Sequence, residues 1–533
     1  MRLPTHMFLR RARTNPAPAI LLAAILSGIG LSNSIPAAAA SPPFAATLQS
    51  VSAGEFLEAM AQAGPQQTVS FSNTVVTGRV HAGSVGLDTV RAAIRLRGVT
   101  FEEQVSFDRV VFGGPVRVSK TTFVQGASLL DARFEQNVSF TKSSFGGHTT
   151  FKRARFSQSA RFVDIIGNGM MSFSSSLFNG EITDFTRAQF LRPAYFDEAT
   201  FANTTSFVDA YFKLESSFKE AHWRSEVDFS GARFDQEALF RQARFGGETT
   251  FDRSRFRRQV LFDKARFERP ASFRDITFVR TASFSRATFI ESVDFSHCRF
   301  KTEADFSDAD FRAPVHLNAY FGRDLILRHA TGPLVDLRFV PTDATAENVD
   351  STFSDTSRIH LHNSDFGRML FDWAQFSGRL AATDTTGAGA LGATYGAVRR
   401  HLEAMGLAAD SRAAFREWME RHRQALPPWG IERLGLEVFG ATTRFGTDPI
   451  RLLWWALGVI LLFAVLIRRL SPKQDDPNGL LHFIYLSLCI FVHLDFHPWH
   501  PVGRTRLLVA IEAVTGWLFL AGFVALFVRL LST

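Results

Sequence analysis

Hydrophobic residues in the middle of the chain recur in alternating steps of five and six residues. From residue 229 to residue 311 every step carries a phenylalanine. The positions are Phe229, Phe234, Phe240, Phe245, Phe251, Phe256, Phe262, Phe267, Phe273, Phe278, Phe284, Phe289, Phe295, Phe300, Phe306 and Phe311. An α-helix would spread such residues around its surface, and a flat strand would place alternate steps on opposite faces. The period instead favours a coil that turns a corner every five or six residues and points one side chain inward from each face.

A second set of positions follows the same period. The residue two before each phenylalanine is small or β-branched, as at Ala232, Ala243 and Val260, so it fits a second inward slot beside an aromatic ring. The period also extends upstream to Phe107, and Trp223 occupies one step in register. Arg, Asp, Glu, Ser and Gly fill the remaining positions, which predicts corners and solvent-facing surfaces of mixed charge.

The stretch VDFSGARFDQEALFRQARF at 227–245 resembles the phenylalanine-rich variant of the pentapeptide-repeat family. The resemblance implies an all-β fold, a right-handed quadrilateral β-helix known as a pentapeptide-repeat solenoid. Four faces in alternating steps make a coil of about 22 residues. We expect the β-helix at 101–380, with a lead-in or cap at 41–100 and roughly nine or ten coils in its clearest part.

Two irregularities interrupt the period. Gly167 stands where a phenylalanine is due, and the step from Phe178 to Phe185 is seven residues long. We therefore expect a bulge or a protruding loop near 165–184, either as a binding feature or as a tolerated insertion. Cys298 falls in an inward small slot, where it acts as a buried equivalent of alanine.

The first forty residues have the three-part layout of an export signal. A basic arm ends at Arg13, an apolar run follows at 19–31, and alanines fill 37–40. The run is short for a membrane span, which needs about 20 residues. We expect a signal peptide at 1–40, with an uncleaved anchor as the alternative. In either case the chain after Ser41 starts outside the cytoplasm.

The period becomes helical after the repeats. Apolar residues step by three and four from Tyr395 to Met405, Gly406 interrupts them, and two prolines stop the pattern at Pro427. This predicts a pair of helices at 391–429 that serves as linker and covers the open end of the solenoid, because repeat arrays need capped ends.

The last hundred residues, 430–533, form an α-helical transmembrane region. Three apolar segments lie at 450–467, 479–494 and 507–528. The first and third are long enough to span a bilayer, and the second is either a third span or a re-entrant segment. A third span is our preferred interpretation, because it agrees with basic residues at 468–473 inside and residues 493–500 outside.

This region resembles the two-helix pore module of ion channels. The resemblance rests on FGTDPIR at 445–451, on the short second segment, and on Glu512 followed by Gly516 in the last span. At the position where a potassium channel has its glycine-rich selectivity filter, the sequence is HLDFHPWHP (493–501), with prolines instead of glycines. The resemblance implies an ion-channel-like protein or sensor with the β-helix as its regulatory domain.

Two candidate sites lie in this region. His493, Asp495, His497 and His500 fall within eight residues. Neutral imidazoles and a carboxylate are suitable ligands for Zn²⁺ or another divalent ion. Histidines also titrate between about pH 5 and 8, so the cluster is alternatively a pH sensor. The third interpretation is an interfacial turn without a specific function. Glu512 is an intramembrane acid, for which a pore or other functional role is the default hypothesis, although headgroups near the end of the span would also solvate it.

Composition excludes several classes of function. Only two cysteines are present, so neither a disulfide framework nor a cysteine-rich metal site is expected. The net charge is +8, and four arginines before residue 14 account for half of that positive excess. Basic and acidic residues are nearly equal in number within residues 101–320. This argues against nucleic-acid binding. No nucleotide-binding or hydrolase motif is present, so an enzyme and a cofactor are not expected.

These observations favour a membrane-anchored, non-enzymatic interaction scaffold in the bacterial envelope. We expect a multi-pass protein of the inner membrane with its repeat domain in the periplasm. Its expected partners are the membrane and a protein or envelope component, with a homo-oligomer as a further possibility. The alternative is the channel-like sensor.

Overall fold

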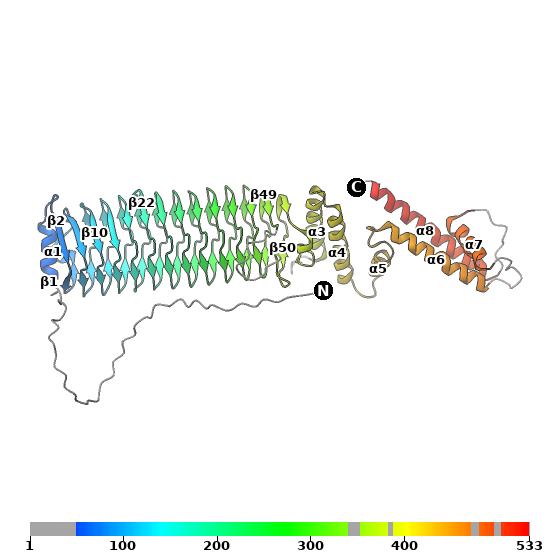
Figure 1. The fold of residues 1–533 in the computed structure, drawn as a ribbon, viewed down its shortest axis with the longest axis horizontal. Helices are drawn as coiled ribbons and strands as arrows, with labels where there is room; N and C mark the ends of the chain where they lie inside the picture. Colours follow the sequence, from blue (N-terminus) through cyan, green and yellow to red (C-terminus); the bar gives the residue numbers. More distant parts are fainter. Residues whose placement is uncertain (1–48, 339–351, 382–386, 471–478, 495–502, 532–533) are drawn as a thin grey trace, which may run out of the picture. The chain divides into compact units, whose positions relative to one another are not determined.

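The structure is a computed structural model that describes residues 49–338, 352–381, 387–470, 479–494 and 503–531. The expected signal peptide at 1–40 lies outside the described residues. The repeat region is a parallel β-solenoid that begins at β1 (Gln49–Ser52) and ends at β51 (Asp365–Leu370) (Figure 1). Its strands form two 13-stranded sheets and one 25-stranded sheet. The quadrilateral β-helix predicted from the period is therefore confirmed.

The larger sheet supplies two of the four faces. They merge in β49 (Thr331–Asp336), which pairs in parallel with both β45 (Asp310–Phe311) and β46 (Val315–His316). One of these faces matters for function and is called the β2–β49 face. In order along the solenoid it contains β2 (Thr68–Ser72), β6 (Ala93–Arg97), β10 (Val116–Ser119), β14 (Val138–Thr141), β18 (Ala160–Arg161), β22 (Ile182–Asp184), β26 (Thr204–Ser206), β30 (Val227–Asp228), β34 (Thr249–Thr250), β38 (Ala271–Ser272), β42 (Val293–Asp294), β46 and β49.

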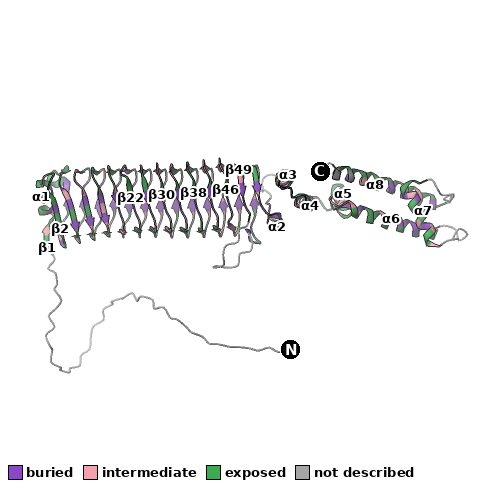
Figure 2. Ribbon diagram, turned by 45° about the horizontal axis from the view of Figure 1, so that its top comes forward, coloured by how far each residue is buried: buried purple, intermediate pink, exposed green. Residues whose placement is uncertain are grey.

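The core is a set of stacked phenylalanine ladders. Phe229 lies between Phe207 and Phe251, with ring centroids 4.6 and 4.7 Å away and nearly parallel planes. Trp223 stacks in the same way between Phe201 and Phe245, so its predicted place in register is confirmed. Such rings bury large apolar areas and set the inward direction of every coil (Figure 2).

Helices cover both ends of the solenoid. At the first end, α1 (Ala53–Gln62) begins with a capping box between Ser52 and Glu55 and buries Phe56 against the ring of Phe101, 5.2 Å between centroids. Burial of this apolar face explains why the helix forms here. The first coil therefore does not leave its core open to water.

The other end is covered by α2 (Trp373–Phe376), α3 (Gly387–Ala404) and α4 (Ala408–Ala425). Tyr395 packs into the core of the solenoid, and its hydroxyl donates to Glu417 at 2.6 Å. Glu417 also accepts from the backbone N–H of Gly378 at 2.9 Å, and Arg421 donates to the Leu380 carbonyl at 2.6 Å. The predicted helical pair is present, and it satisfies polar groups that the last coil would otherwise leave unpaired.

The protruding loop expected near 165–184 is not there. Gly167 continues the ladder in β19 (Ile166–Gly167), between Phe145 and Phe190, and the missing ring is replaced by Met171, which lies 2.6 Å from where a Cβ of Gly167 would stand. The seven-residue step adds one residue before β22, so that Ala160 pairs with Thr183. Flexible methionine side chains fill such gaps, which is why the coil closes without a ring.

This compensation predicts a non-additive pair of substitutions. Gly167→Phe alone places a ring on the Met171 thioether and destabilises the solenoid by about 2 kcal/mol. Gly167→Phe with Met171→Ala restores ring and slot together, so we expect the double variant to unfold at a higher denaturant concentration than Gly167→Phe. If the two effects simply add in a double-mutant cycle, Met171 does not replace the ring.

The C-terminal region contains α5 (Ile431–Thr443), α6 (Pro449–Leu470), α7 (Leu480–Val492) and α8 (Thr505–Leu531). Among the described residues, α6 and α8 are long and apolar enough to cross a membrane. The segment 479–494, for which a third span is the preferred interpretation from the sequence, contains a helix that is shorter than α6 and α8. Its 13-residue helix α7 rises about 20 Å, whereas the hydrocarbon core is about 30 Å thick. The re-entrant interpretation of 479–494 fits this length.

Candidate functional site

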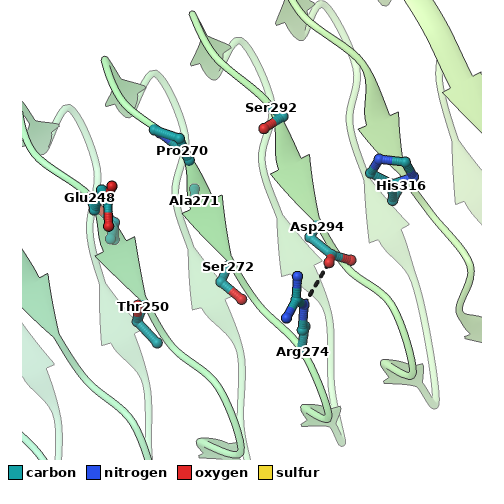
Figure 3. A pocket seen from close by; sticks show the side chains of 10 residues that line it. Glu248, Thr250, Pro270, Ala271, Ser272, Arg274, Ser292, Asp294 and His316 are labelled. Atoms are coloured by element: carbon teal, nitrogen blue, oxygen red, sulfur yellow. Dashed lines mark hydrogen bonds and ion pairs between the residues drawn. The ribbon is translucent and has the colours of Figure 1, made fainter.

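A shallow depression of about 270 Å³ lies on the β2–β49 face (Figure 3). Its floor is a register ladder from four successive strands, in which Thr250 pairs with Ser272, Ser272 with Asp294, and Asp294 with His316. Their side chains project from the same face because adjacent parallel strands keep the same pleat. The depression forms where small residues follow one another between longer neighbours.

The charged groups of the depression are held by hydrogen bonds. Arg274 Nε donates to Asp294 Oδ2 at 2.6 Å, and the Ser296 backbone N–H donates to Asp294 Oδ1 at 2.8 Å. Burial raises the pKa of the Asp294 carboxyl, but the bonds from Ser296 and Arg274 outweigh burial and hold that pKa below its ordinary value. Asp294 is therefore an anion near neutral pH.

Ser272, Asp294 and His316 are the residue types of a hydrolase triad, but their order is wrong for one. A triad needs histidine beside serine, with the carboxylate behind it. Here the aspartate lies between them, so serine and histidine are two strands, or about 10 Å, apart. The Ser272 hydroxyl donates instead to Asp252 at 2.5 Å. The depression can bind polar groups, and its ladder does not place a base beside the nucleophile.

Glu512 is the second candidate site. Its side chain is fully buried between helices, and the Ser487 hydroxyl of α7 lies within hydrogen-bond distance of Glu512 Oε1. The same hydroxyl contacts the Ile460 carbonyl of α6 at 2.8 Å, and among the described residues Glu512 Oε2 has no hydrogen-bond partner. The acid predicted from the sequence is therefore shielded by protein rather than exposed to headgroups. Sequence reasoning missed Ser487, although this hydroxyl stands in an otherwise apolar run.

The chemistry of this centre follows from its protons. A serine hydroxyl has one proton, so Ser487 donates either to the Ile460 carbonyl or to Glu512. A carboxylic acid at Glu512 would donate to Ser487 while Ser487 donates to Ile460, which completes the chain of bonds. An ionised Glu512 would accept the Ser487 proton, and the Ile460 carbonyl would keep the helical N–H of Ala464 as its donor because it lies inside α6. In either state one hydroxyl links α6, α7 and α8 at this centre.

The histidine cluster is described only in part. His493 ends α7 in the left-handed conformation, and its ring centroid lies 6.5 Å from that of Trp517. Asp495, His497 and His500 lie outside the described residues. Within the ranges that the structure describes, no group of three His, Cys, Asp or Glu side chains could hold a metal ion. The predicted metal site at 493–500 remains a prediction.

The fold defines the class of the protein: a four-sided parallel repeat solenoid that carries helices of membrane-spanning length. The family model described as pentapeptide repeats, nine copies, matches residues 96–144, 207–255, 240–288 and 262–310. The solenoid thus contains pentapeptide repeats over these residues. A search of curated proteins and a search of solved structures each found no match.

Proposed function

We propose that the chain is a membrane-anchored, non-enzymatic scaffold of the bacterial envelope. The observation that carries this proposal is the solenoid itself, a stack of buried rings in which Met171 fills the gap at Gly167 and both ends are covered. A close-packed core of this kind resists bending and keeps the outer faces in fixed relation. Fixed flat faces suit the display of contacts to a partner better than they suit a chemical cycle.

The surface of the solenoid supports this role. Many corner charges pair between successive coils, as in Arg153 with Asp131 and Arg187 with Asp164, both at 2.7 Å. These pairs are largely exposed, so each adds little stability. They do fix an ordered array of charges along the coils, which a protein or a charged envelope polymer can recognise.

The membrane orientation follows from basic residues at the ends of the long helices. With α6 and α8 as the spans and α7 re-entrant, Arg468, Arg469, Arg504 and Arg506 share the side of the membrane opposite to the solenoid. Basic residues favour the cytoplasmic side. We therefore place the solenoid in the periplasm and the protein in the inner membrane.

A photo-crosslinking residue at Arg255, on the face that includes β35 (Arg255–Phe256), tests the scaffold role. In intact cells we expect discrete adducts from Arg255 and none from Arg400, an exposed matched position on α3. Absence of adducts from every face of the solenoid, together with ion flux through the purified protein, would contradict the proposal.

A channel-like sensor is the second candidate, and the buried Glu512–Ser487 centre favours it. Intramembrane acids are costly and commonly functional. In proteoliposomes, the scaffold predicts no flux from any form. A channel predicts flux that Glu512→Gln reduces several-fold and that Thr515→Val leaves unchanged, because the Thr515 hydroxyl bonds the Ile511 carbonyl of its own helix.

A further inference from the structure

The β2–β49 face changes its sign of charge along the solenoid. Its outward positions are basic in the first strands, at Arg95, Arg117 and Arg161, and acidic afterwards, from Asp184 and Asp228 onward. Arg95 and Arg117 are register partners on neighbouring strands, and Arg161 and Asp184 are register partners in the same way. The change of sign therefore occurs between the neighbouring strands β18 and β22.

The corners beside this face are of mixed charge. Arg97, Lys120 and Lys142 flank its basic part together with Glu135 and Asp164. The acidic part is flanked by Glu181, Asp209, Glu226 and Glu248 together with Arg187, Arg224 and Arg253. All six cations of the basic part are exposed, and within the described chain none of them forms an ion pair. Further along the face, Arg274 is already paired with Asp294. The arginines of the outward row itself thus all lie on one half of the face.

We infer that the β2–β49 face binds a second copy of the chain in antiparallel orientation. A parallel pair would place arginine against arginine and aspartate against aspartate, which is repulsive. An antiparallel pair with its two-fold axis between β18 and β22 places the basic half of each copy on the acidic half of the other. This inference goes beyond the proposed scaffold role and does not rest on the membrane anchor.

Counting strands from that axis gives the contacts. Arg161 faces the partner's Asp184, Ser139 faces the partner's Ser206, and Arg117 faces the partner's Asp228. Each contact occurs twice because the interface is isologous. Local bonds already orient both carboxylates, since Thr186 N–H donates to Asp184 at 2.9 Å and Ser230 N–H donates to Asp228 at 2.7 Å.

The size of the overlap sets the strength of the dimer. The overlap covers ten strands, from β2 to β38. At about 4.8 Å per strand and a face about five residues wide, it buries about 800 Å² per copy. The total of about 1,600 Å² is that of a specific interface of standard size. High salt weakens the dimer because its contacts are exposed charge pairs.

Charge reversal on the full-length protein in detergent tests the inference by analytical ultracentrifugation. Arg117→Asp and Asp228→Arg each create two like-charge contacts per homodimer, and we expect each variant to dimerise about 100-fold more weakly than the natural chain. Mixed in equal amounts, they form a heterodimer in which both contacts are of opposite sign. Dimerisation should therefore return in the mixture.

Cysteine cross-linking locates the contact. Sheets packed face to face lie about 10 Å apart, and a disulfide spans less than about 7 Å between Cα atoms, so the reagent is a short bismaleimide. In a Cys298→Ala, Cys489→Ala background, Ser139→Cys mixed with Ser206→Cys should cross-link, whereas either variant alone should not. Ser139→Cys mixed with Ser272→Cys is the matched control, because this pair is a further three strands, about 14 Å, out of register.

Several results would overturn the inference. A natural chain that stays monomeric at every concentration and salt, or a mixture that does not recover dimerisation, contradicts the antiparallel pair. Cross-linking of Ser139→Cys with itself would indicate a different arrangement. Binding of inorganic polyphosphate to a monomer, lost in Arg117→Asp, would show that the basic half serves an anionic polymer instead.

Discussion

Replacement of Phe229 by alanine should lower the free energy of unfolding by about 4 kcal/mol, as full truncation of a buried ring does. The ring is stacked on Phe207 and Phe251 and contacts Phe218 and Phe240 edge to face, with centroids 5.6 Å away in each case. Its loss removes apolar burial and leaves a cavity that the neighbouring coils cannot close without bending. Urea denaturation of the full chain, followed by far-ultraviolet circular dichroism, measures the change.

A matched surface variant separates packing from general sensitivity. Gln236 lies a third of a coil after Phe229 with its side chain exposed, and we expect Gln236→Ala to have an effect within about 0.5 kcal/mol. A cost for Phe229→Ala as small as that of Gln236→Ala would mean that the ring ladder does not hold the solenoid together.

Gly516→Ala should detach the short helix α7 from α8. A Cβ at Gly516 would lie 2.1 Å from the Phe491 carbonyl oxygen, which is backbone and cannot rotate away. The shift that relieves this overlap also opens the contact between Ser487 and Glu512, because both lie on the same helix pair. Buried Cys489 on α7 reports the change, and we expect a thiol reagent to modify it at least several-fold faster in the variant.

Gly522→Ala is the control for this experiment. A Cβ at Gly522 would meet a Leu452 side-chain atom at 3.9 Å, an ordinary contact, so the modification rate should stay that of the natural chain. Cys298 serves as an internal standard because it is buried in the solenoid core. Equal rates for Gly516→Ala and the natural chain would show that the close approach of α7 and α8 is not maintained.

The solenoid could be read from the sequence because one physical requirement repeats in every coil. Each face needs one large inward side chain, and stacking on the coils above and below favours the same flat ring each time, so that even Trp223 could be placed. The helical pair was likewise visible, since Tyr395 lies on an apolar stripe with helical spacing.

Other features depend on contacts that no local pattern contains. Met171 replaces the ring missing at Gly167 from four residues away, and a spacing rule cannot show that a side chain will turn back into the gap. Glu512 was recognisable as an acid in an apolar segment, but Ser487 joins it only through the packing of α7 on α8.

A single inserted residue prevents the charge polarity of the β2–β49 face from being recognised in the sequence. Most coils repeat after 22 residues, but Arg161 pairs with Asp184, which is 23 residues later. Counting in uniform coils would assign the residues after this point to the wrong outward positions. Only the strand register shows that arginines and aspartates occupy one continuous face.

Cysteine labelling in intact cells tests the anchored scaffold most directly. Single cysteines replace Gln236 on the solenoid and Arg504 before α8, both exposed, in the Cys298→Ala, Cys489→Ala background, and the reagent is a membrane-impermeant maleimide. A periplasmic solenoid anchored by two spans predicts labelling at Gln236→Cys, and labelling at Arg504→Cys only after the inner membrane is permeabilised. Labelling of both sites in intact cells, or of Arg504→Cys alone, would contradict it.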